Sequence, residues 1–185
     1  MEMKSEDREY AKRDNTEKYM NGNNFNEEVF NQLSRNNKIT NLQKKVKYVN
    51  PLYVEEGKIV DVSFKVDNPI LSKFSFVLEL TTSVRGDRVR GSSHSARIVK
   101  SCNPNIICLL VLKPEEKYDT YKNPKEEIKQ ARRIMDRINN EKMLTDIDFA
   151  LTSDSLNDLI DILCEIKGRK IQKSVTVKKR MQELR

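Results

Sequence analysis

Two runs of alternating apolar and polar residues dominate the middle of the chain, and an Asn68-Pro69 turn signal separates them. Side chains of a strand point to opposite faces with a period of two, so each face can be read from the letters. The apolar faces carry Val60, Val62, Phe64 and Val66 in the first run and Phe74, Phe76, Leu78 and Leu80 in the second. The pattern predicts an antiparallel hairpin with one apolar face.

Polar side chains of this hairpin include two acids that the predicted pairing brings together. Folding the hairpin about Ile70 places Asp61 opposite Glu79, on the face away from the apolar residues. Mg²⁺ prefers hard oxygen donors and usually takes one or two carboxylates together with water and substrate phosphate. The pair therefore predicts a divalent metal site, and the alternative is two solvated acids on a polar face.

The backbone carbonyl of Leu80 is a candidate for a further oxygen ligand beside Asp61 and Glu79. Asp67 lies on the same predicted face as Asp61 and becomes the candidate ligand if the register differs. A Mg²⁺ ion held here, or Mn²⁺ in its place, would orient an attacking water and neutralise charge on a phosphate. Without the metal, two opposed carboxylates repel and the pKa of one of them rises.

Upstream of the hairpin, the apolar spacing predicts a helix over Phe25–Ser34 and a short edge strand over Val46–Val54. Glu55–Gly57 is predicted as the turn that leads into the hairpin. Glu28 lies in the first turn of the helix, where a carboxylate suits the helix dipole. The alternative for Glu28 is a functional position, along the helix edge and pointing into the metal site.

Downstream of the hairpin, Gly86 and Gly91 bracket a very polar stretch that predicts a loop, followed by a helix at about Ser92–Ser101. The run Ile106–Leu112 is apolar throughout, which is typical of a strand covered on both faces. A strand, a short helix and a buried strand in this order predict a crossover connection with parallel pairing.

The remaining predicted elements are a helix over Pro124–Asn139, a strand over Asp146–Leu151 and a helix over Leu156–Ile166. The sequence therefore predicts an α/β fold with a mixed central β-sheet flanked by helices. No repeat or linker divides the chain, so we expect a single domain over residues 1–185. It would carry a polar N-terminal segment (1–24) and a basic C-terminal tail (167–185), with a further strand at Ser174–Val177 as one alternative for the tail.

Charge suggests the kind of partner. The 185 residues include 35 Lys and Arg against 28 Asp and Glu, a net charge of +7. A basic domain of this size favours an anionic partner, most commonly nucleic acid, and the alternative is a merely soluble basic protein. The 3 cysteines include no CxxC pair, which supports neither a disulfide framework nor a zinc site. A charged N-terminus and the lack of any membrane-length apolar run predict a cytoplasmic protein without a membrane partner.

The spacing Asp61-x17-Glu79-x-Thr81 resembles the signature of the PD-(D/E)xK nuclease superfamily, and the helix that carries Glu28 is similar to the leading helix of that superfamily. A further likeness, to cleavage domains of type IIS restriction endonucleases, rests on VDNPI in the hairpin turn, the strand Ile106–Leu112 and DFALTSDSLNDLI at Asp148–Ile160. The resemblance covers roughly residues 25–165. It implies a restriction-endonuclease-like fold and Mg²⁺-dependent hydrolysis of double-stranded DNA.

Thr81 stands where the superfamily usually has a lysine. A threonine hydroxyl can hydrogen-bond to water but brings no positive charge. The candidates for the missing charge are His94, Arg85 and Arg88. His94 is either an ordinary surface residue or a general base or phosphate contact with a useful pKa. The cluster Arg85, Arg88, Arg90 and Arg97 is either a solvated loop or a set of DNA backbone contacts.

No helix-turn-helix, zinc finger or other base-reading module is evident. Type IIS enzymes usually join a recognition domain to a cleavage domain, and this chain resembles the second without the first. We therefore expect the catalytic subunit of a bacterial heterodimeric restriction endonuclease, which cuts one strand while a larger partner recognises the site and cuts the other. The alternatives are a stand-alone repair or recombination nuclease and a non-catalytic DNA-binding or assembly protein.

Overall fold

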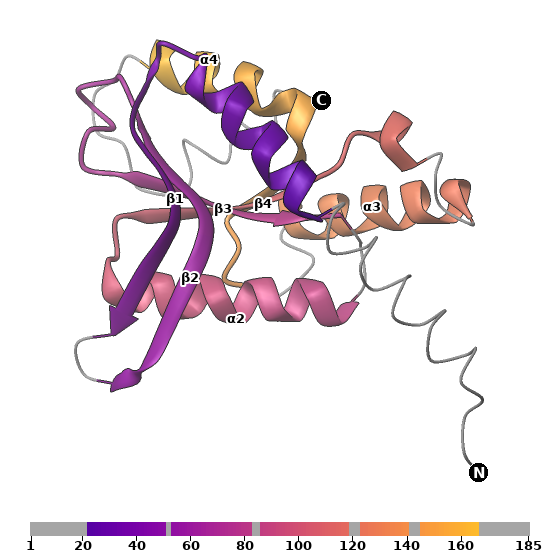
Figure 1. Ribbon diagram of the computed structural model, residues 1–185, viewed down its shortest axis with the longest axis horizontal. Helices are drawn as coiled ribbons and strands as arrows, with labels where there is room; N and C mark the ends of the chain where they lie inside the picture. The colour runs from indigo at the N-terminus through magenta and orange to yellow at the C-terminus, as the bar shows by residue number, and fades with distance from the viewer. Residues whose placement is uncertain (1–21, 51–52, 83–85, 119–122, 141–144, 167–185) are drawn as a thin grey trace.

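The computed structural model describes residues 22–50, 53–82, 86–118, 123–140 and 145–166, which form one mixed sheet with helices on both faces (Figure 1). The strands, in their order across the sheet, are β1 (Ile39–Asn50), β2 (Tyr53–Val66), β3 (Ser75–Thr81), β4 (Ile106–Leu112) and β5 (Phe149–Thr152). β1, β2 and β3 are antiparallel neighbours, whereas β3, β4 and β5 run parallel. The predicted α/β fold and the predicted parallel crossover are both confirmed.

Four helices flank the sheet in the described residues: a first helix at residues 22–34, α2 (Gly86–Cys102), α3 (Pro124–Asn139) and α4 (Leu156–Glu165). Figure 1 shows the first helix and α4 on one side of the sheet and α2 on the other. None of these helices combines the length and the apolar character needed to cross a membrane.

The sheet separates two apolar cores, and β4 contributes to both. All seven residues of β4 are buried. Ile107, Leu109 and Val111 pack with the first helix and α4, in what we call the upper core. The alternate residues of β4 pack with α2 and α3, in the lower core. A strand buried on both faces reads as a continuous apolar run, which is why this element was predicted correctly.

The central hairpin has the predicted register. Val62 pairs with Leu78 and Phe64 with Phe76, whose rings stack with centroids 5.4 Å apart in the upper core. Val60 departs from the predicted face, because it packs in the lower core.

The edge strand is longer than the sequence predicted. β1 begins at Ile39 rather than at Val46, and β2 begins at Tyr53, so Glu55–Gly57 belongs to a strand and is not the predicted turn. Asn41 and Lys45 have positive φ angles of 53° and 51°, a conformation that non-glycine residues rarely adopt. These two residues disturb the alternation of side chains in β1, and a period-of-two reading therefore misses the strand.

The helix after β3 also begins earlier than predicted. The stretch from Gly86 to Gly91 was predicted as a loop, but α2 starts at Gly86. Val89 is buried in the lower core together with Ala96 and Val99, at spacings that place all three on one helix face. The single apolar residue in a polar stretch was too weak a signal. Predictions that concern residues 1–21, 83–85 and 167–185, including the strand at Ser174–Val177, lie outside the described residues.

Asn68, in the hairpin turn, ties β2 to the end of α4. Its buried side-chain amide donates to the carbonyl oxygens of Leu163 (2.8 Å), Cys164 (3.2 Å) and Ile166 (3.2 Å). Its Oδ1 atom accepts the backbone N–H of Ile70 at 2.9 Å. The last carbonyl groups of a helix lack partners in the regular helical pattern. This amide donates to them, and the backbone N–H of Ile166 also donates to the Leu163 carbonyl, at 3.4 Å.

We expect Asn68→Ala to lower the free energy of unfolding by about 2 kcal/mol, because buried carbonyl groups lose their donor. Chemical denaturation followed by circular dichroism measures the change. The matched control is Asn31→Ala, an exposed asparagine of the first helix, which should change stability by less than about 0.5 kcal/mol. Equal stabilities for the two variants would contradict the role given to Asn68.

Candidate functional site

The two predicted acids lie where β2 and β3 separate. The paired residues of the two strands end at Val62 and Leu78, and Asp61 and Glu79 are the next residues in the same register. From this point β3 continues beside β4 as far as Thr81, while the preceding part of β2 pairs with β1 alone. The sheet therefore forks at the acidic pair, and we call this place the fork.

In the arm formed by β1 and β2, the side chains change at the fork from one face of the sheet to the other. Val62 packs in the upper core and Val60, two residues before it, packs in the lower core, so the alternation of side chains breaks at Asp61. Opposite Asp61 on β1 is Lys45, whose φ of 51° marks the same break on the neighbouring strand. The break accounts for the position of Val60, and it lets Asp61 reach toward β3 and the first helix.

Asp61 is held by donors from three elements. Its Oδ2 atom accepts the backbone N–H of Leu80 on β3 at 2.9 Å. Its Oδ1 atom accepts hydrogen bonds from Lys45 Nζ at 2.9 Å and from Asn26 Nδ2, on the first helix, at 3.2 Å. The side chain is only 20% exposed. The carboxylate is therefore fixed against the backbone of β3, one residue away from Glu79.

Glu79 is largely buried, and the described residues do not supply all of the hydrogen bonds that its carboxylate can accept. Within the described residues, its Oε1 atom is buried and has no hydrogen-bond partner. Burial raises the pKa of Glu79 to about 7, the nearby charge of Asp61 adds to the rise, and Lys58 and Lys45 oppose it. An acid in this state can accept a proton or a cation near neutral pH, as groups at functional sites often do.

The donor set fits a Mg²⁺ ion better than a transition metal. In the described part of the chain, no group of three or more His, Cys, Asp or Glu side chains comes together as a metal cluster. Mg²⁺ needs only one or two carboxylates, because water and substrate phosphate complete its coordination. The buried, unpaired Oε1 of Glu79 is an oxygen that such a cation would satisfy. Asp61 and Glu79 are thus the two side chains that could hold it.

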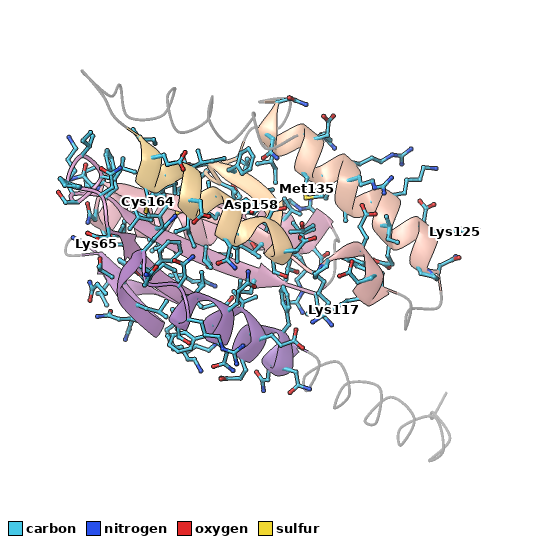
Figure 2. All side chains as sticks on the ribbon, turned by 90° about the horizontal axis from the view of Figure 1, so that it is seen from above. Lys65, Lys117, Lys125, Met135, Asp158 and Cys164 are labelled. Carbon is cyan, nitrogen blue, oxygen red and sulfur yellow. The ribbon has the colours of Figure 1, made fainter. Side chains whose placement is uncertain are left out.

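Glu28 does not extend toward the acids. Its carboxylate pairs with Lys117 Nζ at 2.5 Å and is 53% exposed. Lys117 belongs to the short 3-10 helix η1 (Glu115–Tyr118) and is labelled in Figure 2. Each residue turns a helix by about 100°, so when Asn26 faces Asp61, a residue two positions later faces elsewhere. The predicted direction of Glu28 is therefore corrected, and Asn26, which no sequence pattern indicated, contacts Asp61.

His94 and the arginines of α2 lie on the solvent side of that helix. His94 is exposed, on the side opposite to the residues that α2 buries in the lower core. Arg90 and Arg97 follow the spacing of the same exposed face, and Arg97 Nε pairs with Asp146 at 3.1 Å. Arg88 is also exposed, and Arg85 lies outside the described residues. The structure thus gives His94 no contact with the two acids.

Two lysines that the sequence pattern did not indicate, Lys45 and Lys58, act on the acids. Lys45 contacts Asp61, and the positive charges of Lys45 and Lys58 both act on Glu79. Thr81 is the last residue of β3 and is partly buried, two residues beyond Glu79. Asp67, the alternative ligand, is exposed in the hairpin turn beyond the paired residues. The register therefore supports Asp61 rather than Asp67 as the candidate metal ligand.

The whole fold is similar to that of a restriction endonuclease. A solved structure described as "Restriction endonuclease PspGI-substrate DNA complex" aligns with 98% of this chain and 67% of its own chain, at a TM-score of 0.50 and 14% sequence identity. No protein-family model and no curated protein matches the sequence. At this identity the likeness concerns the fold, which is the restriction-endonuclease-like fold that the sequence resemblance implied.

Burial of Glu79 has a consequence for stability. A carboxyl whose pKa is raised in the folded state penalises folding once it ionises, so the penalty is absent below pH 4.5 and is complete above about pH 7. We expect Glu79→Gln to raise the free energy of unfolding by about 1–3 kcal/mol at pH 8 in EDTA, and the gain to disappear near pH 4. Urea denaturation at the two pH values measures the difference.

Glu116→Gln is the matched control, because Glu116 is exposed on η1. It should leave stability unchanged at both pH values. A Glu79→Gln variant that is less stable than the wild type at pH 8 would contradict the burial described for this carboxyl.

Proposed function

We propose that this chain is a Mg²⁺-dependent DNA endonuclease subunit that cleaves one strand of duplex DNA by phosphodiester hydrolysis. The observation that carries the proposal is the fork, where Asp61 is fixed beside Glu79 and a buried carboxylate oxygen of Glu79 has no partner among the described residues. The similarity of the whole fold to a restriction endonuclease supports the same class of reaction. Fold similarity alone would not assign an activity, so the acidic pair is essential.

The side chains at the fork suit this chemistry. A bound Mg²⁺ ion, or Mn²⁺ in its place, would polarise a phosphate oxygen and make water a stronger nucleophile. Asp61 and Glu79 would hold it, with the Leu80 carbonyl as a third oxygen, and the positive charge of the ion would favour the ionised form of Glu79. Thr81 would hydrogen-bond to the attacking water without supplying charge.

Double-stranded DNA is the proposed substrate on grounds of charge. The chain carries a net charge of +7, and Arg88, Arg90 and Arg97 are exposed on α2, where they could contact phosphates. Exposed lysines on β1, namely Lys44, Lys45 and Lys47, form a second basic stretch near the fork. Phosphate contacts of this kind position a protein on DNA but carry no sequence information directly.

Site recognition is assigned to a larger partner subunit. One metal site cuts one strand, so a double-strand break requires a second site, which the partner would supply in a heterodimer on DNA. The proposal places the chain in a bacterial type IIS restriction system in the cytoplasm. A stand-alone repair or recombination nuclease would use the same acids without such a partner.

A non-catalytic DNA-binding or assembly protein is the second candidate function. The observations that favour it are Thr81 at the position of the usual lysine and the ion pair by which Lys45 already neutralises Asp61. In this case the basic surface would bind phosphates electrostatically, and no divalent metal would be required. Cleavage assays separate the two candidates.

For the endonuclease, Asp61→Asn and Glu79→Gln should each lower the rate of plasmid nicking in Mg²⁺ by about 10³-fold or more, because each removes a ligand. Conversion of supercoiled to open-circular plasmid, in a reaction that includes any partner the wild type needs, measures the rate. Asp67→Asn is the control and should cleave like the wild type, since Asp67 is exposed in the turn. Full activity of Glu79→Gln would show that the site is misassigned.

The partner requirement has its own test. We expect the wild-type chain with its recognising subunit to give linear plasmid, and the same mixture with Asp61→Asn to give only nicked circles, because one strand is then left uncut. Gel analysis of the products after equal DNA turnover distinguishes the two. A wild-type chain that linearises plasmid by itself would favour the stand-alone nuclease, and one that binds but never cuts would favour the DNA-binding protein.

A further inference from the structure

Lys45 is a cation in direct contact with the acidic pair. Its Nζ atom lies 2.9 Å from Oδ1 of Asp61, and its side chain is 60% exposed whereas that of Asp61 is 20% exposed. It lies opposite Asp61 across the β1–β2 ladder, because Lys44 pairs with Val62 and Val46 with Val60. The ammonium group therefore reaches the fork from solvent, on a long side chain that can also leave it.

The backbone at Lys45 has an unusual conformation. Its φ of 51° lies in the left-handed region, which costs a lysine roughly 1 kcal/mol relative to the ordinary strand conformation. Asn41, the other described residue with positive φ, belongs to a residue type that tolerates this region, whereas lysine does not. Position 45 thus carries a lysine although the backbone conformation there is unfavourable for one.

A divalent cation and Lys45 cannot both neutralise Asp61 in the same way. Oδ1 of Asp61 already accepts from Lys45 and Asn26, and Oδ2 accepts from Leu80. The oxygen without a partner belongs to Glu79, on which Lys45 also exerts an attraction. An incoming metal would take over the charge that Lys45 now compensates, and the ammonium would be displaced while still tethered at the fork.

We propose that Lys45 is a built-in cation of this site: it neutralises Asp61 before metal binds, competes with the metal for that carboxylate, and once displaced supplies the positive charge that Thr81 lacks to the scissile phosphate. This inference rests on the proposed nuclease function. It assigns the missing charge to β1, which precedes the acidic hairpin, and not to His94, which is exposed on the outer side of α2.

The two parts of this role predict opposite effects when the ammonium is removed: metal should bind more tightly, and cleavage should be slower. One variant therefore tests both. Lys45→Gly removes the ammonium and gives position 45 the residue that its φ favours, so the variant should fold. We expect it to bind Mn²⁺ about fivefold more tightly than the wild type without DNA, by isothermal titration calorimetry, because the competing cation is gone. At saturating Mn²⁺ and DNA, its nicking rate should fall about 10²-fold.

Lys45→Arg keeps a cation on the strand and should retain the Mn²⁺ affinity of the wild type within about twofold. Lys125→Ala is the control for loss of one exposed lysine, since Lys125 is exposed on α3 and does not lie on the strands of the fork. It should leave Mn²⁺ affinity and the saturated rate near the wild-type values. Lys58→Ala tests the other lysine that acts on Glu79.

Unchanged or weaker Mn²⁺ binding by Lys45→Gly would overturn the inference, and so would a saturated nicking rate equal to that of the wild type. An affinity gain seen only in Lys58→Ala would assign the competing cation to Lys58 instead. These results leave the nuclease proposal intact, because the wild type would still bind metal and cut. A wild-type chain that binds no Mn²⁺ and cuts nothing would overturn both.

Discussion

The hydrogen bond from the backbone N–H of Leu80 to the carboxylate of Asp61 is the contact on which the candidate site depends. A backbone donor at the end of a ladder must find an acceptor. Here a side chain provides it, at the position where β2 turns away from β3. The same bond thus ends the pairing of two strands and fixes one acid beside the other. Lys45 and Asn26 then brace this carboxylate from β1 and from the first helix.

The two cores provide the rigid support that such a site requires. β4 is buried on both faces and aligns β3 along its full length, so the position of Glu79 is set by the center of the sheet. The arm of β1 and β2 is anchored at its other end by Asn68, which holds the hairpin turn to α4. Asp61 and Glu79 therefore lie on two supported strands, at the point where the pairing of those strands ends and the fork begins. A site built on strands is held more precisely than one built on loops.

The charge at the fork is poorly balanced by neighbouring protein groups. Burial makes ionised Glu79 costly, and no hydrogen bond to its Oε1 within the described residues offsets the cost. Local costs of this kind are common at functional sites, where a ligand or a proton provides the compensation. Lys45 compensates Asp61 directly and Glu79 only at longer range. The fork is thus suited to a further cation, which is the basis of the proposed function.

Short-range periodicity in the sequence determined the strands of the central hairpin, their register and the buried strand β4, because burial on one or both faces leaves a direct pattern in the letters. The position of Asp61 close to Glu79 followed from that register. The sequence did not reveal the positive φ of Lys45, the turn of the arm at the fork or the rotation of the first helix that selects Asn26 over Glu28. Those depend on contacts between segments far apart in the chain, which only the packed tertiary structure decides.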